Sequence, residues 1–478
     1  MREALADDLR AALQAADFTH DRVVEVLGTT AQAGLARNET TPGLRATRGG
    51  SRLETLIRLW LLQTVITREA ADLALPGLVD RLVNAGFLIQ SVGEVAARID
   101  IRPYAADDLD LWVASDLTPG LDGAPNLVSP DFVLGVSSAS TSLAQMTIRD
   151  QVGTALDLGT GCGVQSLHLA AHAQHVVATD VNPRALRLAR FNAQLNEVDI
   201  DVRDGSYFEP VVDEAFDLIV TNPPFVISPA TGERLVYRDS GLPGDRVVEH
   251  IVSASPAHLN PGGIAQVLAN WMILKDRPWA ERVGEWVSGC DAFVVQREVV
   301  DLPTYVELWL KDAGLHGAPD YHDRYDTWLS WFDDQGVEAV GFGWINLRRN
   351  DTEPTLRFDD WPYEVEQPIG AELAAQLRRL RPVDLTGQRL TTRSDVLQET
   401  IGPVGAEDPS QIVIRQQRGM RRARQVSTAE AALVGACDGD LSIDQIQSAL
   451  EDLGVGRVAD EVVDALVADG FLVNEETS

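Results

Sequence analysis

The sequence predicts an α/β protein whose central part forms a parallel sheet covered by helices. Between about residues 150 and 350, apolar runs of strand length alternate with stretches of helical periodicity. This alternation is typical of parallel strands joined by crossover helices. The runs are 154–158, 175–179, 216–221, 263–269, 292–299 and 337–347. A chain of 478 residues is long enough for about two to four domains, so we expect the sheet to form one domain among several.

Two similar segments lie on either side of this central part. Val79–Ile89 and Val463–Val473 share seven of eleven positions, and each reads as a helix that ends at glycine and continues into Phe-Leu. A helix that runs into such a step is typical of the third helix and wing of a winged-helix unit. The alternative is any small helical domain that ends a helix with glycine and an apolar anchor. DNA binding does not follow from either interpretation.

The charge balance is strongly acidic, with 72 acids against 40 bases and a net charge of −32. Such a surface disfavours a non-specific coat on nucleic acid or an anionic membrane as partner. One stretch, Arg378–Arg424, is basic, since it contains ten arginines and five acids. It predicts either an RNA-phosphate contact beside the active site or docking onto the acidic remainder of the same chain.

The few cysteines and the lack of a membrane-spanning apolar run indicate a soluble, reduced, cytoplasmic protein without a membrane partner. Its three cysteines are too scattered for a disulfide framework or a cysteine-based zinc site. No metal site is expected, because His168 and His172 lack a third ligand within sequence reach and fit a solvated helix face better. The aromatic segment 325–332 is expected to cover the last strands, with a shelf for a base as the alternative.

A glycine-rich turn follows the first apolar run. Residues 155–164 read Ala-Leu-Asp-Leu-Gly-Thr-Gly-Cys-Gly-Val. Glycine lacks a Cβ atom, so the turn can be tight and a ligand can lie against the backbone. No Gly-Lys-Ser/Thr follows, which excludes a phosphate-binding P-loop. The candidate cofactor-binding residues of this turn are Asp157, Gly159, Thr160, Gly161 and Gly163.

Two further acids belong to the next two predicted strands. Asp180 ends the second strand, where a carboxylate can accept both ribose hydroxyls and would repel a 2′-phosphate. A further strand, the third in chain order, is expected in Val202–Ser206, between the runs 175–179 and 216–221. Its Asp204 is positioned to meet an adenine amino group. Either acid alone could be a solvated loop residue or a helix N-cap. Together with the glycine turn, they predict a site for an adenosine-containing cofactor.

The fourth strand ends in Asn222, Pro223, Pro224 and Phe225. Two consecutive prolines restrict the backbone and remove two N–H donors, which exposes carbonyl groups toward the pocket. The Asn222 side-chain oxygen and the Pro223 carbonyl can together accept both hydrogens of a planar NH₂ group, and Phe225 can stack on the group that bears it. The alternative is a rigid strand-to-loop turn without a catalytic role.

These motifs together resemble the class I N-methyltransferases with an (Asn/Asp)-Pro-Pro-aromatic motif. That group includes adenine- and guanine-N-methyltransferases and release-factor glutamine methyltransferases. Residues 222–229 and 203–210 are most similar to the last of these, although Phe replaces Tyr. Residues 132–143 occupy the place of a loop and helix that flank the methyl donor, but they lack the usual Pro-Arg-x-x-Thr-Glu. The resemblance covers about residues 130–350.

The resemblance implies a Rossmann-like core of seven strands with S-adenosyl-L-methionine as cofactor. The glycine turn, Asp180 and Asp204 would hold that cofactor, and Asn222–Phe225 would hold the acceptor nitrogen. Four regions are expected. Residues 1–130 form a mainly helical substrate-recognition domain, for which a winged-helix-like fold is one option, and residues 131–350 form the catalytic domain. Residues 351–425 form a linker and docking region, and residues 426–478 form a small winged-helix-like domain.

The predicted activity is N-methylation of a planar NH₂ group. The first prediction for the acceptor is an exocyclic amine of a base in structured RNA, ribosomal or transfer, because the winged-helix-like ends and the arginine stretch suit a large folded target. The alternative is a glutamine side chain of a protein such as a release factor. A third hypothesis is a cofactor-binding scaffold or sensor without catalysis.

Overall fold

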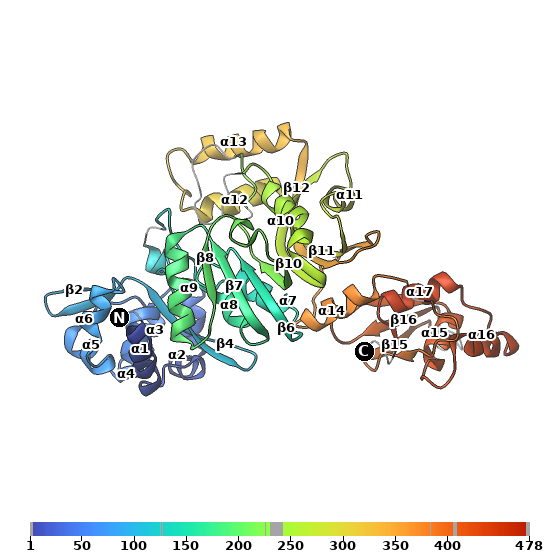
Figure 1. Cartoon of the computed structure of the whole chain (residues 1–478), viewed down its shortest axis with the longest axis horizontal. Coiled ribbons are helices and arrows are strands. Elements are labelled where there is room, and N and C mark those ends of the chain that lie inside the picture. The colour runs from blue at the N-terminus through green and yellow to red at the C-terminus, as the bar shows by residue number, and fades with distance from the viewer. Residues whose placement is uncertain are drawn as a thin grey trace.

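A mixed sheet of eight strands forms the centre of the computed structural model (Figure 1). Its strand order is β13-β11-β12-β10-β9-β6-β7-β8. The strands are β6 (Val152–Leu158), β7 (Ala173–Asp180), β8 (Asp201–Asp204), β9 (Phe216–Thr221), β10 (Leu259–Leu274), β11 (Cys290–Asp301), β12 (Val337–Arg349) and β13 (Leu356–Asp360). The structure describes residues 3–474 apart from 125, 127, 225, 230–241, 383 and 405–408.

The predicted Rossmann-like core of seven strands is confirmed by β6 to β12. β12 runs antiparallel to β10 and β11, whereas the other neighbouring pairs are parallel. An eighth strand, β13, extends the sheet beyond β11. The sequence did not indicate β13, since an edge strand with partly exposed side chains lacks the continuous apolar run of a buried strand.

Helices cover both faces of the sheet. α10 (Arg246–Ala254) and α11 (Trp279–Gly284) pack on one face. α7 (Ser138–Met146) and α14 (Gly370–Arg379) pack on the other. Burial on both faces explains why the central strands are continuous apolar runs rather than alternating ones. The remaining helices of the core are α8 (Val164–Leu169), α9 (Pro183–Leu195), α12 (Leu302–Asp312) and α13 (Tyr321–Asp334).

The N-terminal region packs against the α8 and α9 side of the core (Figure 1). Its helices are α1 (Glu3–Ala15), α2 (His20–Leu35), α3 (Thr41–Ala46), α4 (Arg52–Leu56), which continues as a π-helical turn (Ile57–Leu61), α5 (Arg68–Ala74) and α6 (Val79–Asn84). Its strands are β1 (Ile66–Thr67), β2 (Leu88–Ser91), β3 (Glu94–Ala97), β4 (Asp100–Ala106) and β5 (Leu109–Ser115). The order from α4 to β3, with β3 between β1 and β2, is why we propose a winged-helix-like unit here.

The C-terminal module repeats part of this arrangement with a different connection. It contains β14 (Thr391–Thr392), β15 (Val396–Ile401), β16 (Gln411–Gln416), β17 (Ala423–Val426), α15 (Thr428–Ala436), α16 (Ile443–Asp452), α17 (Asp460–Ala468) and β18 (Leu472–Val473). The two similar sequence segments are α6 with β2 and α17 with β18. In the N-terminal unit the central strand β3 follows β2, whereas in the C-terminal module β14 precedes the helices and pairs with both β18 and Asp438.

The region expected to be a linker is largely ordered structure. Residues 351–425 hold β13, α14 and the strands β14 to β16, and β17 begins within them. Hydrogen bonds then join this region to the C-terminal module, for example from the Gln376 side chain to the Ala468 carbonyl at 2.8 Å. The region therefore connects the sheet to the module through defined contacts.

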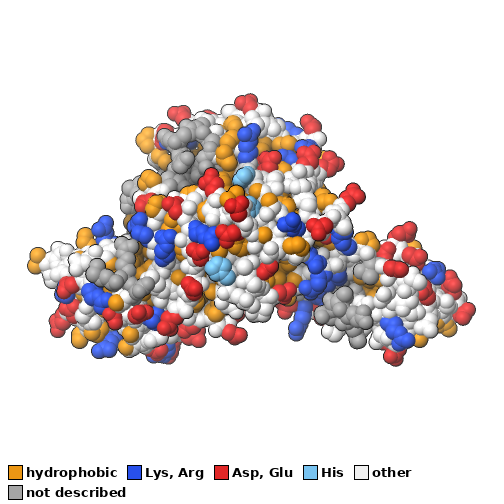
Figure 2. Space-filling model, viewed as in Figure 1, with side chains coloured by type: hydrophobic (Ala, Val, Ile, Leu, Met, Phe, Trp, Pro, Cys, Tyr) orange, Lys and Arg blue, Asp and Glu red, His pale blue; other side chains and the backbone are white. Residues whose placement is uncertain are grey.

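Most of the arginine stretch forms ion pairs within the chain. Figure 2 shows basic side chains gathered where the core meets the C-terminal module, and acidic ones spread over the rest of this face. Arg422 and Arg424, for example, pair with Asp359 and Asp469. At least eight of the ten arginines form such pairs, namely Arg378, Arg379, Arg381, Arg393, Arg415, Arg421, Arg422 and Arg424. Intramolecular docking accounts for most of the local positive charge.

Two asparagines of α9 join the N-terminal hairpin to the core. Asn192 donates to the Ala114 and Cys162 carbonyls and accepts from the Ala114 N–H, at 2.7–2.8 Å. Asn196 does the same for the Trp112 N–H and carbonyl at 2.8–2.9 Å. Spaced one helical turn apart, these side chains satisfy the open edge of β5 as a neighbouring strand would.

Replacing Asn192 should destabilise the protein without changing core volume. In Asn192→Leu, three buried backbone groups lose their partner, and we expect the free energy of unfolding to fall by about 3 kcal/mol. Urea unfolding of the full chain measures this change. Arg187→Ala, on the exposed side of the same helix, is the control and should change stability by no more than about 0.5 kcal/mol. A loss below about 1 kcal/mol for Asn192→Leu would contradict the bridging role.

Candidate functional site

The sheet brings the predicted site residues to one edge. β6 pairs with β7 at Leu158–Thr179 and with β9 at Leu158–Thr221. On the far side of β7, Asp180 lies opposite Asp204. Because these strands are parallel and end at the same level, the glycine turn, the two acids and the Asn-Pro-Pro segment all follow strand ends at this edge. This is where open α/β sheets bind ligands.

The three glycines of the turn have different roles. Gly159, Gly161 and Gly163 all have positive φ, at 76°, 58° and 90°. A Cβ added to Gly159 or Gly161 would meet no atom within 4 Å, whereas one added to Gly163 would lie 3.2 Å from the Cα of Ala189. The first two therefore present bare backbone to open space, and the third allows the turn to pack on α9. The open backbone fits the cradle expected for a cofactor.

Asp157, near the end of β6, stabilises the glycine turn through hydrogen bonds. Its carboxylate is buried and accepts hydrogen bonds from the Thr160 hydroxyl at 2.6 Å and from the Ser166 N–H and hydroxyl at 2.9 and 2.6 Å. Burial raises the pKa of Asp157 to about 6, although the hydrogen bonds from Ser166 and Thr160 act in the opposite direction. The Asp157 carboxylate and the Thr160 hydroxyl therefore hydrogen-bond to each other and to Ser166, within the protein, and do not face the open space beside Gly159 and Gly161.

Asp180 faces the turn from the neighbouring strand. One carboxylate oxygen accepts from the Gly161 N–H at 2.9 Å and the other from the Asn182 N–H at 2.8 Å. Burial raises the pKa of this carboxyl group, and the two backbone hydrogen bonds oppose that shift. Asp204, opposite it on β8, is exposed. The two acids are therefore adjacent and remain able to accept further hydrogen bonds.

Asn222 directly follows the end of β9. The Thr221 hydroxyl donates to the Leu158 carbonyl at 2.7 Å, which ties the ends of β9 and β6 together. The side-chain oxygen of Asn222 is buried and has no hydrogen-bond partner among the described residues. A buried acceptor without a partner is costly and points to a ligand that supplies the donor. Pro223 is buried and Pro224 partly exposed, whereas Phe225 lies outside the described residues.

The segment 131–140, most of which the resemblance places beside the methyl donor, contacts the helix after the glycine turn and the turn after β7. Asn182, after β7, donates to the Asp131 carbonyl at 2.9 Å, and Gln165 of α8 donates to the Ser140 carbonyl at 2.7 Å. Ser137 caps α7 in a reciprocal pair with Ser140. The sequence indicated the position of this segment by resemblance, but not its contacts to α8 and to the β7–α9 turn, because these span 25 and 51 positions.

His168, on α8, and His172, which follows that helix, are both buried, which corrects the expected solvated helix face. The N-terminal hairpin covers His168, since the Tyr104 hydroxyl lies 3.1 Å from the His168 Nε2 atom. Burial lowers the pKa of His168 to about 4, with Arg149 and His172 adding to the shift. Within the part of the chain that the structure describes, no group of three or more His, Cys, Asp or Glu side chains could hold a metal ion.

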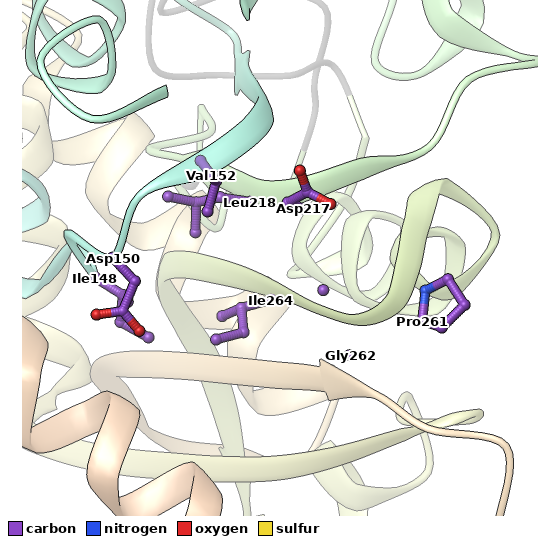
Figure 3. Close-up of a pocket in the computed structure, with 9 residues that line it drawn as sticks. Ile148, Asp150, Val152, Asp217, Leu218, Pro261, Gly262 and Ile264 are labelled. Atoms are coloured by element: carbon purple, nitrogen blue, oxygen red, sulfur yellow. The ribbon is translucent and has the colours of Figure 1, made fainter. Parts of the chain in front are cut away.

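A cavity of about 200 Å³ lies at the opposite edge of the sheet (Figure 3). Its lining comes from the beginnings of β6, β9 and β10, including Val152, Asp217 and Ile264. Both Asp217 carboxylate oxygens accept hydrogen bonds there, from Gly153 and Thr154 on one side and Asn260 on the other. This cavity is therefore separate from the strand ends that carry the predicted motifs.

The fold and the site define a class I methyltransferase, and known proteins agree with this class. Residues 135–284 match the methyltransferase small domain, and residues 15–98 match a domain of unknown function, DUF7059. The release factor glutamine methyltransferase of Geobacter sulfurreducens is 30% identical over 237 residues, which cover 47% of this chain and 79% of that protein. That of Aquifex aeolicus is 44% identical over 80 residues, which cover 16% of this chain and 28% of that protein.

Among solved structures, the 16S rRNA N2 G1207 methyltransferase of T. thermophilus is 17% identical, with a TM-score of 0.26 over 46% of this chain and 58% of that one. The chain belongs to the family of S-adenosylmethionine-dependent methyltransferases that contains the release factor glutamine methyltransferases. It is an N-methyltransferase with S-adenosyl-L-methionine as cofactor. Among its described helices, none combines the length and the apolar composition needed to cross a bilayer.

The buried Asp157 should give the protein a specific pH dependence of stability. Its pKa of about 6 in the folded protein lies above the ordinary value of 3.8, so between these pH values the folded chain binds a proton that the unfolded chain releases. The stability of the wild type relative to Asp157→Asn should therefore decrease as the pH rises from about 4 to about 6. Urea unfolding of both proteins across this range measures the difference, and a constant or increasing difference would contradict the shift.

Proposed function

We propose that this protein methylates the side-chain carboxamide nitrogen of a glutamine in a protein substrate. The observation that carries this proposal is the similarity to a release factor glutamine methyltransferase over 79% of that protein's length. The buried, unpartnered side-chain oxygen of Asn222 supports it, because a carboxamide offers the planar NH₂ donor that such an oxygen requires.

The chemistry assigned to the acceptor side uses only hydrogen bonding and orientation. The Asn222 side-chain oxygen and the Pro223 carbonyl accept the two N–H groups of the carboxamide. These bonds strengthen as the nitrogen becomes pyramidal and its lone pair leaves conjugation with the carbonyl group. An N–C bond then forms as the methyl–sulfur bond breaks, and the extra proton on nitrogen leaves to water. No general base is required, since that proton becomes acidic once the methyl group has arrived.

The cofactor-side roles are part of the same proposal. The bound cofactor supplies an electrophilic methyl group on its sulfonium. Gly159 and Gly161 would lie against its amino-acid part, Asp180 would accept its ribose hydroxyls, and Asp204 would accept from its adenine amino group. Asp157, Thr160 and Gly163 would act through the shape of the turn. Residues that hold the cofactor and the carboxamide in a fixed mutual orientation would supply much of the rate enhancement.

The RNA-base acceptor has less support in the structure than it had in the sequence. Besides the winged-helix-like ends, its argument was the positive charge of Arg378–Arg424. At least eight of those arginines pair with carboxylates of the same chain, among them Arg381 with Asp291. An arginine already held by a carboxylate gains less from a phosphate, since the existing pair must be broken. We assign the winged-helix-like units to contacts with the protein substrate.

The acceptor can be identified by labelling. Wild-type protein with labelled S-adenosylmethionine should transfer label to release factors, at glutamine, and leave ribosomal and transfer RNA unlabelled. Asn222→Ala should lower kcat by about 100- to 1,000-fold, because one hydrogen-bond acceptor of the transition state is lost. The matched control is Asn84→Ala on the exposed side of α6, which should retain full activity. Label found only in RNA would overturn the glutamine acceptor.

The cofactor site can be tested separately by calorimetry. Asp180→Asn should raise the Kd for S-adenosylmethionine by about 10- to 100-fold, since hydrogen bonds to a charged group contribute about 1.5–3 kcal/mol. Asp213→Asn, at an exposed position between β8 and β9, should leave the Kd unchanged. NAD should not compete. An unchanged Kd for Asp180→Asn would remove Asp180 from the cofactor site.

A further inference from the structure

Two helices inserted between β11 and β12 pack against the segment that follows the Asn-Pro-Pro motif. α12 and α13 stand beside the end of the sheet in Figure 1. Val226 and Ile227 share one apolar cluster with side chains of these helices, including Tyr305 and Phe332. Trp328 also lies in this cluster, against β12, which is the covering role that the sequence predicts for the aromatic segment. The inserted helices therefore reach the acceptor side of the site.

The Tyr305 hydroxyl makes a specific contact within this apolar cluster. It is fully buried and accepts the Ile227 N–H at 2.8 Å. The Asn270 side chain, on β10, also donates to it at 3.4 Å. Ile227 follows the Asn-Pro-Pro segment closely and lies in irregular backbone, so this bond restrains the path of the chain beyond the motif.

Asn270 carries a second amide oxygen without a partner. The residue is 0% exposed, and no described residue hydrogen-bonds to its side-chain oxygen. β10 pairs with β9 at Gln266–Val220. Since side chains alternate along strands, Asn270 lies on the same face of the sheet as Gln266 and its partner Val220. Asn222 follows the last residue of β9, Thr221. The two unpartnered amide oxygens thus belong to adjacent strands, one just after the end of β9 and the other within β10.

We propose that Asn270 and Tyr305 form a second, specificity-determining subsite for the acceptor. The Asn270 side-chain oxygen accepts an N–H donor of the substrate next to the reacting NH₂, which in a polypeptide is a backbone amide. Tyr305 is a positioning residue, because it orients the Asn270 side chain and holds the Ile227 amide. The identity of the donor, a backbone amide, rests on the proposed function, whereas the existence of the subsite does not.

A structural role alone would not explain the unpartnered oxygen. A core residue at this position would be more favourable as leucine, which has a similar volume and no polar atom to leave unpaired. A buried polar group without a partner lowers the stability of the fold, and such groups are expected at functional sites. Tyr305 alone could serve packing, so its test requires a measurement that packing would not change.

The first test replaces Tyr305 with phenylalanine, which keeps the ring in the apolar cluster and removes the hydroxyl. We expect faster hydrogen exchange at the Ile227 amide and a 5- to 50-fold lower kcat/KM, mainly through KM for the acceptor, with unchanged Kd for S-adenosylmethionine. The matched control is Tyr325→Phe on α13, whose hydroxyl lies 3.4 Å from Glu307 at an exposed site. It should match the wild type in both measurements.

The second test replaces Asn270 with leucine. Stability in urea should stay the same or increase, while kcat/KM falls at least 10-fold at unchanged affinity for the cofactor. A variant that loses stability but keeps wild-type kcat/KM would overturn the subsite. Three results for Tyr305→Phe would also overturn the subsite. They are wild-type hydrogen exchange at the Ile227 amide, faster exchange with an unchanged KM for the acceptor, and weaker cofactor binding as the only defect.

The two variants can fail independently of the proposed glutamine acceptor. Kinetics are measured on the fraction that the wild type labels, whether protein or RNA, and the exchange and cofactor measurements need no acceptor. Label in RNA with both variants impaired would overturn the glutamine acceptor and support the subsite, which would then accept a ring N–H. Label in release factors with both variants kinetically normal would support the proposed function and overturn the subsite.

Discussion

The candidate site depends on the register that pairs β6 with β7 on one side and with β9 on the other. Because the strands are parallel, their carboxyl ends meet at one edge, and residues that follow different strands become neighbours there. A slip of one residue would turn Asp180 or Asn222 to the opposite face of the sheet. The continuous apolar composition of these strands matters here, since burial on both faces holds the register that places the polar groups.

Buried polar side chains satisfy backbone groups near this edge, and two of them come from distant parts of the chain. Asp157 supports the glycine turn, Asn192 supplies partners for β5 and for the Cys162 carbonyl, and Tyr305 accepts the Ile227 N–H. Buried N–H and carbonyl groups require such partners. As a result, the N-terminal domain and the inserted helices are connected to the site by hydrogen bonds as well as by apolar packing.

The sequence was sufficient for the central strands, the glycine turn and the placement of Asp180 and Asn222, because each depends on neighbouring residues and strand periodicity. The sequence was not sufficient where a residue is covered by a segment that is distant along the chain. The spacing of His168 and His172 suits an exposed helix face, yet both side chains are buried, and the hairpin that carries Tyr104 covers His168. β13 lacks the apolar run of an inner strand. The arginine stretch left a nucleic-acid contact and intramolecular docking both open, because several of its carboxylate partners, such as Asp291 for Arg381, are far away in sequence.

By itself, the sequence determined the class of fold and the type of chemistry, since strand-end acids, a glycine turn and an Asn-Pro-Pro segment are local patterns with local geometry. Tertiary structure alone decided which polar groups are already satisfied and which remain free to bind. The charges of Arg378–Arg424 are largely neutralised within the chain, whereas the amide oxygens of Asn222 and Asn270 have no partner among the described residues. The physical reason is that a hydrogen bond or ion pair depends on distance in space, and only the packed chain sets that distance.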